Sequence, residues 1–134
     1  MNTILKNVIS FDIPLNPVTK KNHGQIILCK GHPLMLPSKP YLQYEKDCKP
    51  FMPNLQSPID YPINLKCTFY MKTRRKVDLS NLLAAISDIL SKYNVILDDN
   101  RNIIASYDGS RVYYDKDNPR TIIEITKIND YSQW

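Results

Sequence analysis

The spacing of apolar residues changes between positions 63 and 93, and this change constrains the fold more than any other feature of the sequence. Over Ile63–Lys72, apolar and polar side chains alternate, which is typical of a β-strand with one buried face. Over Leu79–Tyr93, apolar residues recur about every 3.6 residues, which predicts an amphipathic helix. Asp78 is expected to be the N-cap of this helix. Asn94 is expected to end the helix in the left-handed conformation, as a left-handed stop. The sequence therefore predicts a strand, a basic connection (Arg74-Arg75-Lys76) and a helix.

Shorter elements are expected on both sides of this strand and helix. A second helix is expected over Tyr41–Phe51, where Pro40 and Pro50 limit its length. The last strand is apolar at three of the four positions from Ile122 to Ile125, so we expect it to be buried on both faces. The expected strands are Ile4–Ile13, a hairpin of Gln25–Lys30 and Leu34–Leu36, Val95–Leu97, Ile103–Tyr107, Arg111–Tyr114 and Pro119–Ile128.

The order of these elements indicates a fold class. Strands, then a helix, then more strands are typical of an α+β domain with a mixed β-sheet flanked by helices. The length of 134 residues fits a single domain over residues 1–134, with a frayed tail from residue 129. No apolar run approaches the roughly 20 residues that span a bilayer, and the first residues lack a signal-peptide pattern. We therefore expect a soluble protein of the cell interior.

Charge and cysteine usage narrow the function classes. Residues 1–77 carry twelve Lys and Arg against four Asp and Glu, whereas residues 78–134 carry six against nine. A basic part suits a polyanion and an acidic part suits cations, which together fit an enzyme acting on nucleic acid. An unevenly charged solvated surface is the alternative. The three cysteines and two histidines lack metal-binding spacing, so neither a zinc site nor a disulfide framework is expected.

The length of the predicted helix suggests that its N-terminal end lies at an acidic site. A helix of about 14 residues is roughly 21 Å long, and Val95–Asp99 spans roughly 16 Å if extended. A chain that doubles back after Asn94 would bring Asp98 and Asp99 close to Asp78. Clustered carboxylates without Cys or His favour Mg²⁺ or Mn²⁺, which can activate a water for attack on a phosphodiester. The helix N-terminus and the basic run before it would bind neighbouring phosphates.

Each of these features also has a purely structural explanation. Asp78 can act as a helix cap, and Asp98-Asp99-Asn100 can be an ordinary turn. Asn81 and Asp88 share a polar stripe of the helix, which solvent can cover. The basic run can be an exposed loop. The functional interpretation therefore depends on these features meeting at one place.

Several motifs together resemble the RusA-type Holliday-junction resolvases. The central ones are Lys76-Val77-Asp78-Leu79-Ser80-Asn81-Leu82-Leu83, Asp88-Ile89-Leu90 and Val95-Ile96-Leu97-Asp98-Asp99-Asn100. Pro17–Asn22, Pro37–Tyr41, Asp108–Arg111 and Asn118–Thr121 are also similar to that family. The resemblance covers most of the chain, from about Ile9 to Ile128.

The resemblance implies a RusA-like fold and a homodimeric endodeoxyribonuclease that requires Mg²⁺, or Mn²⁺ in its place. Its substrate would be the four-way (Holliday) DNA junction, cut symmetrically in two strands during recombination or repair. Such proteins are typical of bacteriophages and prophages, which implies the cytoplasm of a bacterial host and no membrane partner. A two-fold dimer suits a substrate with near two-fold symmetry.

The family motif also assigns roles to individual residues. Asp78 and Asp99 match its catalytic aspartates, and Asn81 matches its asparagine. Ser80 stands where the family has a further aspartate, and Ala84 stands where it has a lysine. Ser80 and Ala84 therefore replace an acidic and a basic residue of the family pattern.

Other residues are candidates for the carboxylate that Ser80 lacks and for the ammonium group that Ala84 lacks. Asp98 or Asp88 would supply the carboxylate, and Lys76 or Lys92 the lysine. We expect catalysis by Asp78, Asp99 and Asp98, and metal binding by these three and Asp88. Ser80 and Asn81 would contact the metal ligands and would not be metal ligands themselves. The expected DNA contacts are Lys20, Lys21, Lys39, Arg74, Arg75 and Lys76.

Three functions are consistent with this sequence. The first is a metal-dependent nuclease acting on four-way junctions. The second is a junction- or branched-DNA-binding protein with reduced or no cleavage, which the replacements at Ser80 and Ala84 favour. The third is a small interaction protein unrelated to DNA, in which the acidic residues are only caps and turns.

Overall fold

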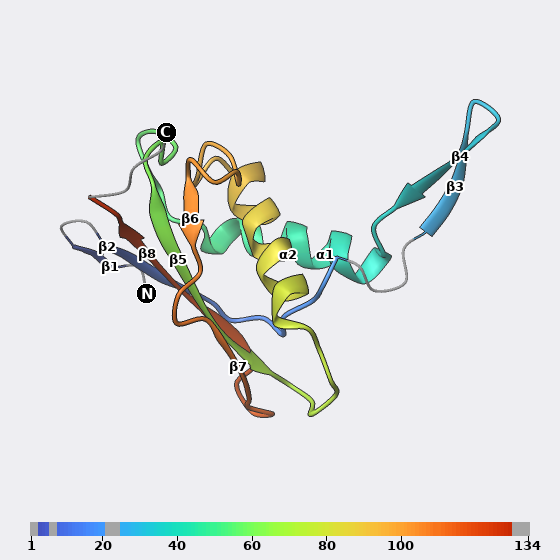
Figure 1. Cartoon of the computed structure of the whole chain (residues 1–134). Helices are drawn as coiled ribbons and strands as arrows, with labels where there is room; N and C mark the ends of the chain where they lie inside the picture. Colours follow the sequence, from blue (N-terminus) through green and yellow to red (C-terminus); the bar gives the residue numbers. More distant parts are fainter. Residues whose placement is uncertain (1–2, 6–7, 21–24, 130–134) are drawn as a thin grey trace.

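The computed structural model describes residues 3–5, 8–20 and 25–129 (Figure 1). Its strands are β1 (Thr3–Leu5), β2 (Val8–Ile13), β3 (Gln25–Cys29), β4 (His32–Leu36), β5 (Ile63–Met71), β6 (Ile104–Ser106), β7 (Arg111–Tyr114) and β8 (Arg120–Lys127). Its helices are α1 (Lys39–Cys48), the short 3-10 helix η1 (Lys49–Phe51) and α2 (Leu79–Lys92). These elements form an α+β fold, as the sequence predicts.

The central strand of the sheet is β5. Within the described residues, six strands form one sheet in the order β1-β2-β8-β5-β6, and β7 also pairs with β5. The neighbours β2, β8 and β5 are antiparallel, whereas β6 and β7 run parallel to β5. The strand β6 pairs with the start of β5 at Ile63, and β7 pairs with its end at Met71. The predicted mixed sheet is therefore confirmed.

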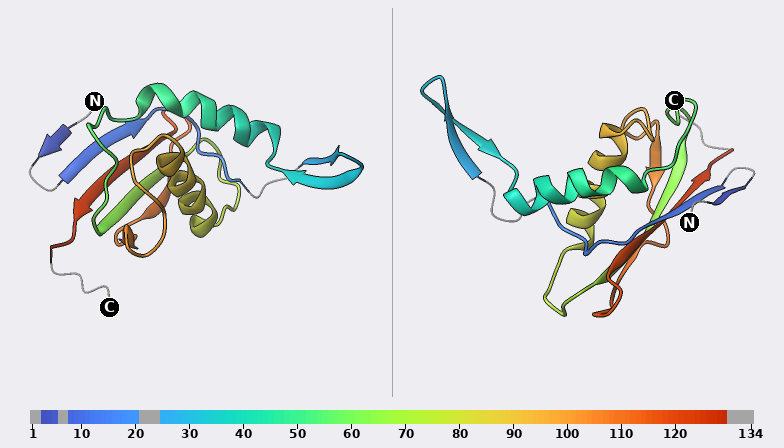
Figure 2. Two further views of the ribbon diagram at one scale, coloured as in Figure 1. Left: turned by 90° about the horizontal axis from the view of Figure 1, so that it is seen from above. Right: turned by 180° about the vertical axis from the view of Figure 1, so that it is seen from behind.

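Both α-helices lie on one face of the sheet, and the core lies between them and the strands (Figure 2). Residues of β5 alternate between buried and half-buried, so its apolar side chains face the helices. Leu82 and Ile86 of α2 share this core with Leu65 and Phe69 of β5. Full burial of one such side chain is worth about 1.5–3 kcal/mol. This packing fixes α2 against β5 and thereby fixes the position of Asp78.

The two elements with long periodic patterns agree with prediction to within a residue. The predicted strand Ile63–Lys72 is β5, and the predicted helix Leu79–Tyr93 is α2. Asn94 has a positive φ of 59°, which confirms the left-handed stop. The first helix begins earlier than expected, because the Ser38 hydroxyl caps it by accepting from the Tyr41 amide at 3.3 Å.

Three expected strands differ from the structure. Ile4–Ile13 is two antiparallel strands, β1 and β2, rather than one. In β8, buried and half-buried residues alternate, so the expected burial of Ile122–Ile125 on both faces is wrong. Val95–Leu97 is not a strand, because only Ile96 forms an isolated bridge, with Ile59.

The strands β3 and β4 form the expected hairpin, which projects away from the sheet and helices (Figures 1 and 2). Its turn is Lys30-Gly31, and both residues have positive φ, as a two-residue hairpin turn requires. Much of its apolar surface is exposed, at Ile26, Ile27, Leu28, Leu34 and Met35. An isolated two-stranded hairpin is marginally stable in water.

Candidate functional site

Asp78 lies at the N-terminal end of α2, as predicted, but its side chain does not cap the helix. Its backbone carbonyl accepts hydrogen bonds from the Asn81 and Leu82 amides, and its carboxylate makes no capping bond to them. The carboxylate instead accepts from the Asn81 side-chain amide at 3.3 Å. Asp78 is exposed, so its carboxylate is accessible beside the positive end of the helix dipole.

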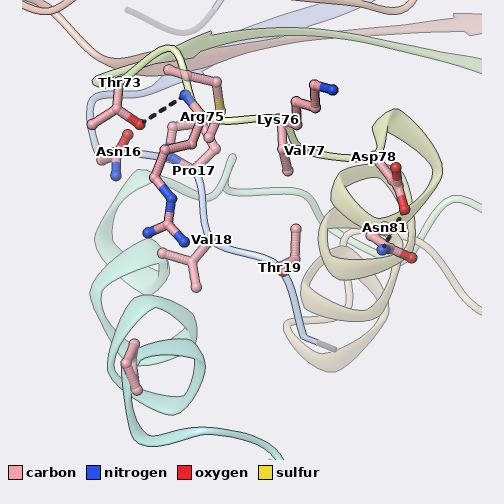
Figure 3. Close-up of a pocket in the computed structure, with 12 residues that line it drawn as sticks. Asn16, Pro17, Val18, Thr19, Thr73, Arg75, Lys76, Val77, Asp78 and Asn81 are labelled. Carbon is pink, nitrogen blue, oxygen red and sulfur yellow. Dashed lines mark hydrogen bonds between the residues drawn. The ribbon is translucent and has the colours of Figure 1, made fainter. Parts of the chain in front are cut away.

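A cavity of about 450 Å³ opens beside Asp78 (Figure 3). Two segments form most of its wall: the chain after β2 and the connection from β5 to α2. The connection contributes the basic Arg75 and Lys76, which lie near the acidic Asp78 and its partner Asn81. The lining residues are Asn16, Pro17, Val18, Thr19, Pro40, Met71, Thr73, Arg75, Lys76, Val77, Asp78 and Asn81. Such a mixture of basic side chains and a helix N-terminus suits a phosphate group.

Asp88 lies on the same helix, ten residues after Asp78. At 1.5 Å per residue, this separation is about 15 Å along the helix axis. The Asp88 carboxylate accepts a hydrogen bond from the Lys20 ammonium at 3.0 Å. Lys20, one of the expected DNA contacts, is therefore already paired with an acidic residue.

Asp98, Asp99 and Asn100 form a tight turn that one carboxylate organises. Asp98 accepts from the Asp99 amide at 2.7 Å and from the Asn100 side chain at 3.2 Å. Partial burial, a hydrogen bond to Asp98 and the negative charges of Asp88 and Asp98 raise the pKa of Asp99. Asp88, Asp98 and Asp99 are called the acidic group below because their negative charges act on one another, although they do not form a metal-binding cluster within the described residues of one chain.

This acidic group and Asp78 lie at opposite ends of the helical layer. Ile104, five residues after Asp99, pairs with Ile63 at the start of β5, whereas Asp78 follows the end of that strand. Figure 1 shows the segment that contains Asp99 beside the C-terminal end of α2. The expected return of Asp99 to Asp78 within one chain is therefore wrong.

The cause is the path of the chain after α2. The Val95 amide donates to the Leu90 carbonyl, and the Val95 carbonyl accepts from the Ile59 amide. The Leu97 amide then donates to the Ile59 carbonyl, which holds the segment at the helix end. The turn around Asp98 follows at once, so the extended return that the sequence suggested does not form. Within residues 3–5, 8–20 and 25–129, no three His, Cys, Asp or Glu side chains form a ready metal-binding group.

Tyr107 and Ser87 are neighbours of the acidic group that sequence patterns did not identify. Their hydroxyl oxygens are 2.8 Å apart, and Ser87 also donates to the Leu83 carbonyl at 2.8 Å. Burial raises the pKa of Tyr107, and the charges of Asp99 and Asp88 contribute. No spacing rule connects these positions, because β6 brings Tyr107 back beside α2.

The other predicted DNA contacts are spread over the molecule. Lys39 is exposed at the start of α1, and Arg74 lies over the Tyr114 ring at 4.0 Å from its centroid. Lys21 lies outside the described residues. Lys92, a candidate for the missing lysine, is 2.5 Å from Glu45 at the far end of α2. Lys76, the other candidate, lines the cavity beside Asp78.

Comparison with known proteins identifies the family. A search of curated proteins gives no match. None of the helices in the described segments is long and apolar enough to cross a membrane. The family model described as endodeoxyribonuclease RusA matches residues 14–126, which confirms the resemblance and the fold. The chain belongs to the RusA family of endodeoxyribonucleases and is an endonuclease.

Proposed function

We propose that the protein cuts four-way DNA junctions as a homodimer, with Mg²⁺ as its cofactor. Family membership supplies the reaction class, which is endonuclease action on DNA. The metal assignment is carried by the exposed carboxylates of Asp78 and Asp99, which one chain holds apart and which a second copy would bring together. Repair or recombination of branched DNA in a bacterial cell, including DNA of phage origin, is the matching role.

The chemistry of the donors fits a hard divalent cation. The acidic group offers only oxygen atoms, which Mg²⁺ and Mn²⁺ prefer over sulfur and nitrogen donors. A cation would also relieve the repulsion among the three carboxylates. When bound, the metal supplies a polarised water and stabilises the charge that develops on the phosphate.

Residues of the chain would perform the remaining steps of hydrolysis. Asp78 and Asp99 would hold the metal ion as ionised carboxylates, and the attacking water would lose its proton to the solvent. Water attacks the phosphorus atom, and the bond from phosphorus to the leaving sugar oxygen breaks. Arg75 and Lys76, beside the N-terminus of α2, would hold the phosphate oxygens in place.

A second copy of the chain would bring Asp78 and Asp99 together. The exposed side of α2 carries the small residues Ser80, Ala84 and Ser91 on the stripe that includes Asp88. Two antiparallel α2 helices packed along this stripe would place Asp78 of one copy near Asp99 of the other. Each dimer would then contain two equivalent composite sites, which suits symmetric cutting of two strands.

A synthetic four-way junction with fluorescent labels on all four strands tests this proposal. In Mg²⁺, paired nicks should appear at symmetric positions, and excess chelator should abolish them. Asp78→Asn and Asp99→Asn should each lower the cleavage rate about 100-fold or more, because each removes a charged metal ligand. Junction affinity should change by less than about threefold, because the phosphate contacts remain.

The matched control is Asp60→Asn, at an exposed aspartate outside both acidic regions. It should cut at the parental rate. If Asp78→Asn and Asp99→Asn also cut at the parental rate, the assignment of these residues is wrong.

A junction-binding protein without cleavage is the second candidate. It is favoured by Ser80 and Ala84, which replace an expected acid and lysine at the start of α2. It predicts tight, salt-sensitive junction binding with no nicks in Mg²⁺ or Mn²⁺. The same assay therefore separates the two functions.

A further inference from the structure

A row of stacked side chains crosses three neighbouring strands at one end of the sheet. Tyr70 of β5 is paired in register with Arg120 of β8 on one side and with Tyr113 of β7 on the other. The Arg120 guanidinium carbon is 3.8 Å from the Tyr70 ring centroid. The two tyrosine rings are stacked, with centroids 5.5 Å apart and an interplanar angle of 23°. The row lies on the face of the sheet opposite the helices, because Tyr70 alternates with the buried Phe69.

One end of this row is fixed and the other is open. Arg120 is held by the Asp115 carboxylate at 3.0 Å and by the Asn118 carbonyl at 2.9 Å. Tyr113, at the other end, is 49% exposed on β7, which pairs with β5 alone in the described structure. Its outer ring face is therefore available to a further flat group.

The surroundings of the row are strongly basic. Residues 72–76 and 111–120 form the two chain segments at this end of the sheet (Figure 1), with seven Lys and Arg against two Asp. Arg111 is exposed on the same strand face as Tyr113, two residues earlier. Arg74 lies over the ring of Tyr114, which follows Tyr113 directly and therefore points to the other face of the strand. Arg111 therefore shares its strand face with Tyr113, whereas Arg74 does not.

We propose that this end of the sheet binds unpaired nucleotides of branched DNA, with a base stacked on Tyr113 and the adjoining phosphate held by Arg111. Aromatic side chains within a basic groove are the usual means of binding single-stranded DNA, and they accept any base because every base has a flat face. The positive charge opposes a second copy of this chain on the same surface, since two such surfaces would repel each other. This inference rests on the proposed action on branched DNA.

Binding of a fluorescein-labelled 15-nucleotide oligothymidine, measured by anisotropy, tests the stacking contact. Tyr113→Leu should weaken this binding about tenfold, as expected for one lost base–aromatic stack, and weaken duplex binding by much less. Tyr113→Phe keeps the ring and should restore binding to within about twofold. The matched control is Tyr61→Leu, because Tyr61 lies under Lys127 in a similar pair outside this row. It should leave oligothymidine affinity unchanged.

A crosslinking experiment locates the base. An oligothymidine with one 5-iododeoxyuridine, irradiated in complex with the full chain, should give an adduct that mass spectrometry maps to Tyr113. The proposal is overturned if Tyr113→Leu binds oligothymidine as the parent does, or if the adduct maps elsewhere. It is also overturned if Tyr113→Leu dissociates a dimer in light scattering, because the surface is then an interface between copies. A protein that binds no DNA at low salt instead contradicts the proposed function itself.

Discussion

The Lys20 ammonium lies 3.0 Å from an Asp88 carboxylate oxygen, and this ion pair joins the chain after β2 to the third turn of α2. The two side chains are 46% and 35% exposed, so the pair contributes at most about 1 kcal/mol of stability. Its position matters more than its strength. Asp88 is one of the charges that raise the pKa of Asp99, so Lys20 competes with a divalent cation for the acidic group.

Lys20→Met should therefore strengthen the binding of Mn²⁺ to the protein. The substitution keeps the length of the side chain but leaves the Asp88 charge without its partner, which increases attraction for a cation. The Kd for Mn²⁺, measured by paramagnetic resonance of the free ion, should fall about two- to fivefold. Lys46→Met, at an exposed position of α1, is the matched control and should leave the Kd unchanged. Weaker binding by Lys20→Met would show that Lys20 supports the metal site instead.

The raised pKa of Asp99 predicts a stability difference that depends on pH. The folded protein holds the proton of Asp99 more tightly than the unfolded chain, so stability falls as pH rises from the ordinary aspartate pKa through the raised value. The Asp99→Asn variant does not lose stability in this way, because its side chain does not titrate. The variant should be more stable than the parent at pH 7, by at most about 1 kcal/mol for such an exposed group. The difference should vanish near pH 3.5 in urea unfolding, and a difference independent of pH would contradict this account.

Asn64 should be important for the position of Tyr107 beside the acidic group. Its side-chain oxygen accepts from the Ser106 hydroxyl at 2.6 Å and from the Asp108 amide at 2.7 Å, and its nitrogen donates to the Asp108 carbonyl at 3.1 Å. Asn64→Ala leaves these groups without partners and should lower the free energy of unfolding by about 1–3 kcal/mol. Lys66→Ala, next on the same strand face, removes only a 3.4 Å ion pair with Glu124 and should cost less than about 1 kcal/mol. Equal losses of unfolding free energy in the two variants would show that the hydrogen bonds of Asn64 do not hold this segment in place.

The fold could be predicted wherever one spacing pattern continued over many residues. Ile63–Lys72 and Leu79–Tyr93 met this condition, because each places a long apolar face against the same core. Ile4–Ile13 did not, since the break between β1 and β2 leaves the apolar pattern almost unchanged.

The candidate site was predicted only in part, because its geometry depends on contacts between distant residues. The position of Asp78 followed from the local helix pattern. The position of Asp99 depends on hydrogen bonds of Val95 and Leu97 to Ile59, far earlier in the chain, which local spacing does not encode. The stacking of Tyr70 and Tyr113 likewise depends on the parallel pairing of β5 with β7.

The exposed hairpin of β3 and β4 should contribute to dimer formation. Five of the eight large apolar side chains exposed in the described residues belong to it, and they lie on both of its faces. Leu28→Asp places a charge among them and should shift the protein from dimer to monomer in light scattering at micromolar concentration. Gln56→Glu, at an exposed loop position, adds the same charge elsewhere and should remain dimeric. A parent protein that is already monomeric would contradict the proposed homodimer.

Mixed dimers of two inactive variants should regain one active site. If each site combines Asp78 of one copy with Asp99 of the other, then pairing Asp78→Asn with Asp99→Asn puts both substitutions in one site and leaves the second intact. Refolding the two variants together should restore nicking of a four-way junction, with single nicks in place of paired cuts. Each variant refolded alone provides the control and should not cut. A site made within one chain predicts no recovery, because every chain in the mixture then lacks one of the two aspartates.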